Sequence, residues 1–202
     1  IKAYTSDIGF NMTVVGQQIF GGHGYIEDWG MSQIVRDSRI AMIYEGANGV
    51  QAIDLVGRKL NSDGGRNILY LCDLVKAFIH EKSEIEGLED DFLAPLKNSF
   101  QDLEKALKFF LENGLKNPNS ALAGASDFLH LLGIFCTGFM WAKMVACVLE
   151  NKDIGEVDKK FKDAKVITGK FYMENTLTKT SYLATKIITG HETIMSLEPD
   201  QF

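Results

Sequence analysis

Residues 17–60 read QQIFGGHGYIEDWGMSQIVRDSRIAMIYEGANGVQAIDLVGRKL, and glycines divide this stretch into segments with helical spacing of apolar residues. The breaks fall at residues 21–24, which begin a predicted loop through Trp29, and at Glu45-Gly46. Asn48 is the expected N-cap of the segment after the second break. The spacing predicts three helices, over residues 2–20, 31–43 and 48–60.

The second part of the chain has longer helical patterns separated by short connections. Residues 62–65, Ser-Asp-Gly-Gly, form the clearest boundary, so we predict domains over residues 1–61 and 62–202. Beyond the boundary, the spacing predicts four helices, over residues 66–86, 90–113, 120–151 and 156–195. Short connections make consecutive helices antiparallel, and only three prolines interrupt the chain. The sequence therefore predicts an all-α protein whose second part is an up-down four-helix bundle.

The charge and the longest apolar run argue against two classes of partner. The formal net charge is −6 and no basic stripe is present, which disfavours nucleic acid. Residues 131–142 form an apolar run that is shorter than the ~20 residues needed to cross a bilayer. We predict a buried core helix there and no membrane span. No signal peptide is visible, and the amphipathic pattern is already under way at Ile1, so we expect a piece of a longer protein.

Cysteine and histidine spacing indicates no metal site. The three cysteines lack a CxxC spacing, which favours buried, inert thiols over a disulfide framework or zinc; they are Cys72, Cys136 and Cys147. Three histidines fall on separate predicted helices and are expected to be structural or exposed; they are His80, His130 and His191. We expect no metal ligands in this chain.

Three separated motifs carry a family resemblance. They are QIFGGHGY at residues 18–25, RDSR at 36–39 and IYEGANG at 43–49, followed by a helix that ends in LVGRKL. In this order and spacing they resemble the C-terminal helical domain of the acyl-CoA dehydrogenase family, here as an incomplete bundle. Residues after Asn61 are similar to the additional helical domain of the long branch that includes 3-methylmercaptopropionyl-CoA dehydrogenase-like enzymes.

The resemblance implies oxidation of an acyl-CoA to the 2,3-enoyl-CoA in fatty acid metabolism, with FAD as cofactor. Glu45 of the YEG motif would remove the α-proton while the β-hydride passes to FAD. A carboxylate in water is too weak a base for this proton, but desolvation beside ligand and flavin raises its pKa. The backbone N–H of Glu45 and a flavin hydroxyl would stabilise the developing enolate, and Gly46 would lie against the substrate. Without the resemblance, a Glu before Gly at a helix break is most often a surface residue.

The same resemblance implies two groups of flavin-binding residues. The first would reach across a dimer to the adenosine-diphosphate half of the partner's flavin, and it comprises Gln18, Ile19, Phe20, Gly21 and Gly22. The second touches the flavin near the base and comprises Ala47, Asn48 and Gly49. Ala47 stands where the family usually has Thr, which puts in doubt the hydrogen bond that a Thr hydroxyl would make to the flavin. A glycine turn such as this one can also simply end a helix.

Charged residues between the two flavin groups have two readings. Arg36, Asp37 and Arg39 are either a solvated helix face or a buried ion-pair set that holds the loop against the active site. We assign them no catalytic role. His23 occupies the variable position between the glycines and is expected to be a loop residue rather than a base.

The resemblance also implies partners and leaves alternatives open. Family members pass electrons to an electron-transfer flavoprotein and form homodimers or homotetramers, in the bacterial cytoplasm or the mitochondrial matrix. An acyl-CoA oxidase would share the base and the flavin but give its electrons to oxygen. Because most flavin contacts in the family come from domains absent here, we expect the isolated chain to be inactive and to bind FAD weakly. A non-catalytic helical oligomerisation module is therefore the second reading of the isolated chain.

Overall fold

The computed structural model describes residues 1–114, 116–150 and 159–201, and every regular element among them is helical. The all-α prediction is therefore confirmed for this part of the chain. The N-terminal elements are α1 (Lys2–Ile19), α2 (Gly22–Tyr25), η1 (Glu27–Trp29), α3 (Met31–Arg39), η2 (Ile40–Met42), α4 (Asn48–Asp54) and η3 (Leu55–Lys59). The remaining elements are α5 (Arg66–Glu81), η4 (Glu89–Leu93), α6 (Ala94–Asn113), α7 (Pro118–Glu150), α8 (Lys159–Tyr172), η5 (Met173–Leu177), α9 (Lys179–Thr189) and η6 (Pro199–Gln201).

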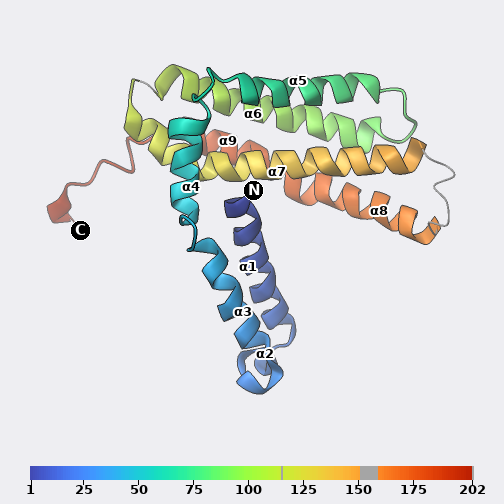
Figure 1. Cartoon of the computed structure of the whole chain (residues 1–202), viewed down its shortest axis with the longest axis horizontal. Helices are drawn as coiled ribbons and strands as arrows, with labels where there is room; N and C mark the ends of the chain where they lie inside the picture. The colour runs from blue at the N-terminus through green and yellow to red at the C-terminus, as the bar shows by residue number, and fades with distance from the viewer. Residues whose placement is uncertain (115, 151–158, 202) are drawn as a thin grey trace.

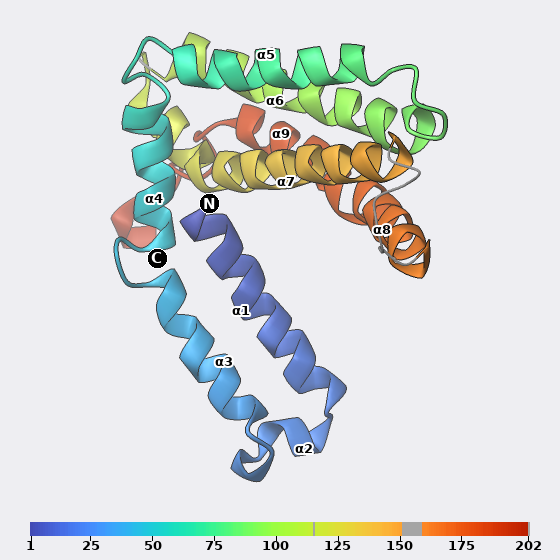
Figure 2. The ribbon, with the colours of Figure 1, turned by 45° about the vertical axis from the view of Figure 1, so that its right-hand side comes forward.

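Helices α1 and α3 lie side by side as a hairpin that projects away from the other helices (Figures 1 and 2). Its tip is not the continuous loop that the sequence predicts, because α2 and η1 form two short helical turns there. Gly21 turns the chain with a φ of 59°. Gly24 must lack a side chain, since a Cβ there would overlap the carbonyl oxygen of Gln17.

The elements from α5 to α9 form an up-down bundle, which we call the extension bundle (residues 66–189; Figure 1). Its fourth member is α8, the π-helical turn η5 and α9 in succession, rather than one regular helix. Two predicted ends are wrong. The first helix stops at Glu81 rather than residue 86, and α9 stops at Thr189 rather than 195 because Gly190 adopts a φ of 78°. The predicted boundaries at 151 and 156 lie outside the described residues.

Helix α7 is the centre of the extension bundle and packs on α6, α8, α9 and α4. The predicted core run is confirmed, because Leu131, Phe135 and Ala142 are fully buried. The helix is long and apolar enough to cross a membrane by length and composition alone. Its contacts with four helices of the same chain instead identify it as a core helix.

The two parts of the chain meet where α4, η3 and the start of α1 pack on α7. Tyr4 is buried and its ring lies directly over Gly133 of α7, where a Cβ would overlap the ring carbons. The Tyr4 hydroxyl lies 3.4 Å from that of Tyr172, which donates a hydrogen bond to the Ile134 carbonyl at 3.0 Å. The predicted domain boundary falls in the turn between η3 and α5, and the assignment of two domains stays a prediction.

The prediction of buried thiols is confirmed for Cys72. Cys136 is only partly buried, and the prediction is wrong for Cys147, which is exposed on α7. Burial raises the pKa of the Cys72 and Cys136 thiols. The pattern failed at Cys147 because α7 is apolar on nearly every side, so the sequence does not reveal its outward face.

Candidate active site

The turn between η2 and α4, residues 43–47, holds the predicted base and is called the Glu45 turn. Glu45 has a φ of 52°, and it is the one non-glycine residue with positive φ in the described part of the chain. Gly46 follows with a φ of 84°. In this left-handed conformation the Cβ of a glutamate crowds the following carbonyl oxygen, which costs about 1–2 kcal/mol. Such backbone outliers cluster at functional sites.

Side chains from two helices hold the backbone of the Glu45 turn. Lys2 Nζ donates hydrogen bonds to the Gly46 carbonyl at 2.8 Å and to Asn48 Oδ1 at 2.8 Å. Gln51 Nε2 donates to the Glu45 carbonyl at 3.1 Å. The Glu45 side chain is exposed, and its carboxylate has no hydrogen bond or ion pair within the described residues. The backbone of the Glu45 turn is therefore held in place, while the Glu45 carboxylate remains accessible to solvent or a ligand.

The structure also gives Gly46 a reason to be glycine. Its positive φ disfavours any side chain, and a Cβ would lie 2.8 Å from Gln51 Nε2. That amide is the group that holds the Glu45 carbonyl. Closeness to a substrate is thus not the only possible reason for glycine at this position.

In residues 47–49, the backbone and small side chains could meet the predicted flavin, whereas the Asn48 amide is engaged with α1. The Asn48 side chain points to α1, where Nδ2 contacts the Ala3 carbonyl at 3.1 Å and Asp7 Oδ1 at 2.6 Å. The prediction that Asn48 is an N-cap is wrong, because Ala47 occupies the cap position and Asn48 is the first helical residue. Around Gly49, a Cβ would meet no atom within 4 Å, so this surface is open to a ligand.

The other predicted flavin group, Gln18 to Gly22, lies at the tip of the hairpin, far from the Glu45 turn (Figure 1). All five residues are exposed, with 79% of Ile19 and 47% of Phe20 accessible. Asn48 contacts Asp7 of α1, and the 11 residues from Asp7 to Gln18 separate the two groups by roughly 16 Å at 1.5 Å per residue. The two predicted flavin groups are therefore distinct places on this chain.

The charged residues of α3 are exposed in this chain, and the alternative of a buried ion-pair set stays a prediction. Arg36 pairs with Glu27 at 2.8 Å, with 58% and 67% of the two side chains exposed. The guanidinium lowers the pKa of the Glu27 carboxyl. His23 is also exposed and lies edge-on to the Trp29 ring, as expected for a residue of the tip rather than a base.

Sequence reasoning missed three residues that organise the Glu45 turn: Lys2, Asp7 and Gln51. Lys2 contacts Gly46 across 44 positions of sequence, and Asp7 contacts His130 across 123. No local pattern marks these residues, because their partners lie on other elements. His191 contacts Asn117 and Ser120, and no group of three metal-ligating side chains occurs in the described ranges.

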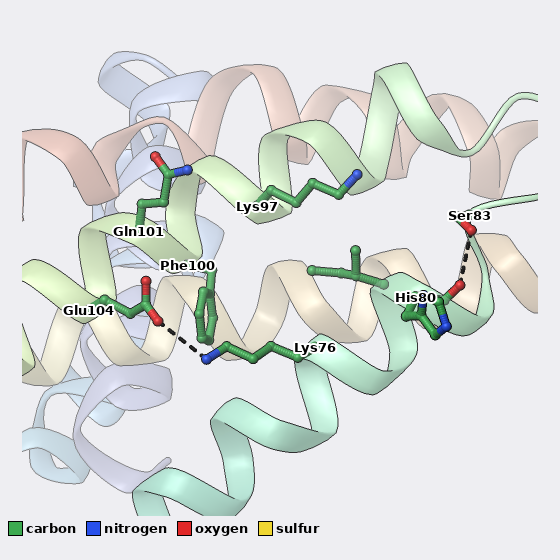
Figure 3. A pocket seen from close by; sticks show the side chains of 8 residues that line it. Lys76, His80, Ser83, Lys97, Phe100, Gln101 and Glu104 are labelled. Atoms are coloured by element: carbon green, nitrogen blue, oxygen red, sulfur yellow. Dashed lines mark hydrogen bonds and ion pairs between the residues drawn. The ribbon is translucent and has the colours of Figure 1, made fainter.

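The larger hollows of the molecule lie away from the Glu45 turn. One of about 740 Å³ is mainly apolar and lies among η3, α5, α6 and α7. Another of about 500 Å³ lies between α5 and α6, where Lys76 reaches across to Glu104 at 3.4 Å beside Phe100 (Figure 3). Its other lysine, Lys97, pairs with Glu89. Because these charges neutralise one another, we assign no chemistry to this second hollow.

Two family models match the chain, one on each part. The model described as "Acyl-CoA dehydrogenase, C-terminal domain" matches residues 1–60, and the one described as "Acetyl-CoA dehydrogenase C-terminal like" matches residues 71–198. The chain belongs to the acyl-CoA dehydrogenase family.

Curated relatives resemble both parts together. The chain is 28% identical to 3-methylmercaptopropionyl-CoA dehydrogenase of Ruegeria pomeroyi, over 97% of this chain and 33% of that protein. It is 27% identical to a butyryl-CoA dehydrogenase of Syntrophomonas wolfei, over 86% and 29%. It is 24% identical to the broad-specificity linear acyl-CoA dehydrogenase FadE5 of Mycobacterium tuberculosis, over 100% and 34%. The chain thus spans about a third of the length of these relatives.

Proposed function

We propose that this chain is the C-terminal third of a flavin-dependent acyl-CoA dehydrogenase, in which Glu45 removes the α-proton of the acyl thioester. The observation that carries the proposal is the Glu45 turn. It combines a left-handed glutamate, an anchored backbone and an exposed carboxylate within the YEG motif. Family membership supports the reaction class, and the names of the relatives support an acyl-CoA as substrate.

The residues of this chain perform two tasks in the proposed reaction. The Glu45 carboxylate accepts the α-proton, and enclosure by the rest of the enzyme and the substrate raises its pKa toward that of a useful base. The Glu45 backbone N–H faces the thioester oxygen and stabilises the enolate as charge develops there. When bound, FAD supplies the acceptor for the β-hydride. Gly46 leaves room beside the acyl group.

Two groups of residues hold FAD in this proposal. Ala47, Asn48 and Gly49 offer their backbone and small side chains beside the base, while the Asn48 amide stays on α1. The tip group from Gln18 to Gly22 lies too far along the hairpin to serve the same part of that flavin. Its separation and exposure support contact with the flavin of a neighbouring subunit in a homodimer or homotetramer.

A second function, that of a helical assembly module, is favoured by the exposed apolar side chains of the hairpin. Accessible fractions are 57% for Met12, 48% for Ile34 and 57% for Ile40. Such a surface is suited to burial against other helices. In the whole enzyme, catalysis and helical assembly coexist. For the isolated chain, we propose that it assembles, has no activity and binds FAD weakly. Tight stoichiometric FAD binding by the 202-residue chain would contradict that last point.

Electron transfer and location complete the proposal. An electron-transfer flavoprotein is the proposed acceptor, with oxygen as the acceptor in the oxidase alternative. The relatives named above come from bacteria, which supports the bacterial cytoplasm as the site of action.

The test uses the full-length protein reconstituted with FAD and a panel of acyl-CoAs without oxygen, with loss of visible flavin absorbance as the readout. Glu45→Gln should slow this loss by about 10²–10⁴-fold, the usual contribution of a general base. Glu86→Gln is the matched control, because Glu86-Gly87 is another exposed Glu-Gly pair whose glycine has a φ of 81°. Equal rates for Glu45→Gln and wild type would place the base elsewhere. If wild type neither binds FAD nor reacts, the assembly function is favoured.

A further inference from the structure

A continuous network of polar contacts connects the extension bundle to the Glu45 turn. His130 of α7 places Nε2 at 2.9 Å from Asp7 Oδ2 on α1. The other oxygen of the same carboxylate, Oδ1, accepts a hydrogen bond from Asn48 Nδ2 at 2.6 Å. Since a carboxylate only accepts, the imidazole nitrogen is the donor. Asp7 therefore bridges the extension bundle and the first residue of α4.

The network continues from Asn48 to the turn itself. Asn48 Oδ1 accepts a hydrogen bond from Lys2 Nζ at 2.8 Å, and the same ammonium group donates to the Gly46 carbonyl at 2.8 Å. The order of contacts is thus His130, Asp7, Asn48, Lys2 and the carbonyl next to Glu45. Only 17% of the Asp7 side chain and 32% of the His130 side chain are exposed. Partial shielding from water strengthens the contact between His130 and Asp7, whereas the contact of Lys2 with the Gly46 carbonyl is exposed.

Packing fixes α1 so that the network has one geometry. The Tyr4 ring lies against Gly133 of α7 and edge-on to the His130 ring at 5.9 Å between centroids. The Tyr4 hydroxyl also lies beside that of Tyr172. Rotation of α1 would therefore break packing as well as hydrogen bonds. The position of Asp7 relative to α7 is defined by both.

We propose that His130 and Asp7 are positioning residues, through which the extension bundle holds the Glu45 turn in its left-handed conformation. The proposal rests on the proposed function, because it assigns the extension bundle a role in aiming the base. Glu45 is held in a backbone conformation that it would not adopt by preference, so surrounding contacts must keep it there. The network supplies one of these contacts at the Gly46 carbonyl. Gln51 supplies another, from α4 itself.

Loss of the network should lower turnover more than substrate binding. Removing a partner that orients a metal-ligating side chain typically costs 10–100-fold in affinity or activity, and we expect an effect of similar size for residues that orient a base. In the full-length enzyme we expect His130→Ala to reduce kcat roughly tenfold, with KM and FAD content unchanged. His130→Gln should lie closer to wild type, because the Gln amide nitrogen can still donate to Asp7. His80→Ala is the matched control, since His80 is an exposed histidine at the end of α5.

An exchange of partners separates positioning from general stability. Asn48→Asp alone places two carboxylates at the 2.6 Å contact and should reduce kcat strongly. Combining it with Asp7→Asn restores one hydrogen bond between an amide and a carboxylate, in which residue 7 now donates to residue 48. Lys2 then faces the carboxylate of Asp at position 48. The double variant should recover part of the turnover that Asn48→Asp loses, because in both variants the carboxylate at position 48 still faces the Ala3 carbonyl, to which the Asn48 amide donates in the wild type. Equal loss of kcat in the double variant and in Asn48→Asp would overturn the proposal. This test remains valid if His130→Ala fails to fold.

Hydrogen exchange gives a readout that does not depend on turnover. Amides in a peptide covering residues 44–51 should exchange faster in His130→Ala than in His80→Ala or wild type, because the turn opens more often. If His130→Ala matches His80→Ala in both kcat and exchange, the network does not position the turn. A fully active Glu45→Gln would instead refute the proposed function, while the exchange result would still decide whether His130 holds the turn.

Discussion

The hairpin and the extension bundle are built from similar amphipathic helices, yet they differ in what their apolar side chains contact. In the extension bundle, Phe92, Phe128 and Phe135 are fully buried by helices of the same chain. On the hairpin, Ile19, Ile34 and other large apolar side chains remain between 39% and 81% exposed. The buried residues of α1 are Ala3 and Tyr4, at the end that meets α7. The helical pattern is the same, and the extension bundle also carries exposed apolar side chains, such as Leu111 at 76% and Ile167 at 69%, but it has a buried core of its own whereas the hairpin buries large side chains only where it meets α7.

This difference indicates where each region obtains its stability. The extension bundle gains from burial of apolar area within the chain, which is the dominant favourable contribution to folding. The hairpin needs an external surface to make the same gain. The chain spans about a third of the length of its relatives, so the rest of the enzyme or a neighbouring subunit can supply that surface. The Glu45 turn lies between the two regions: Lys2 of α1 and Gln51 of α4 hold its backbone, and Asp7 connects α1 to the extension bundle through His130.

The largest expected contrast is between buried and exposed apolar residues of the two regions. Phe135→Ala should lower the free energy of unfolding of the chain by about 3–5 kcal/mol, because it leaves a cavity in the core. Ile34→Ala on the hairpin should change it by less than about 0.5 kcal/mol. Urea unfolding of both variants measures the difference. In the full-length protein, the Ile34 effect should grow if the hairpin is covered there, and no growth would contradict that view.

A second contrast tests the contact between the regions. Gly133→Ala should destabilise the protein by about 1–3 kcal/mol, because the new methyl group overlaps the Tyr4 ring. Gly57→Ala in η3 is the control, since a Cβ there meets nothing within 4 Å. It should stabilise the helix by up to about 1 kcal/mol. Thermal unfolding should therefore show shifts of opposite sign, and equal shifts would mean that α1 does not pack closely on α7.

A third contrast concerns backbone strain. Glu45→Gly should leave stability unchanged or raise it by up to about 1 kcal/mol, because glycine relieves the left-handed strain but adds freedom to the unfolded chain. Glu86→Gly, where φ is not positive, should cost about 0.5–1 kcal/mol. Chemical denaturation of the two variants gives the comparison. Destabilisation of Glu45→Gly beyond that of Glu86→Gly would show that the conformation of Glu45 is not strained.

The smallest expected effect is a ranking of thiol reactivity within the extension bundle. A thiol-specific reagent at pH 8 should label Cys147 first and Cys72 slowly. Burial raises the pKa of the Cys72 thiol, so less reactive thiolate is present at that pH, and access is also limited. Mass spectrometry of labelled peptides over time gives the order. Fast labelling of Cys72 in the folded protein would show that α5 packs more loosely than its burial indicates.

Much of the fold could be predicted because helical periodicity and glycine breaks are local signals. The spacing predicted α1, α3 and the core run of α7, and the motifs led to Glu45 as the candidate base. Helix ends were less accurate, as at Gly190, because capping depends on one residue's conformation. The roles of Lys2, Asp7 and His130 could not be predicted, since each depends on a partner tens of residues away. Whether an apolar face is buried within the chain also depends on packing.

The most direct test of the central claim is α-proton exchange, measured separately from oxidation. The full-length protein with FAD is incubated without oxygen in D₂O with an acyl-CoA on which wild type is active, and deuterium at the α-carbon of the recovered acyl-CoA is measured by mass spectrometry. We expect wild type and Glu86→Gln to incorporate deuterium and Glu45→Gln to incorporate about 10²–10⁴-fold less. Incorporation by Glu45→Gln at the wild-type rate would contradict the assignment of Glu45 as the base.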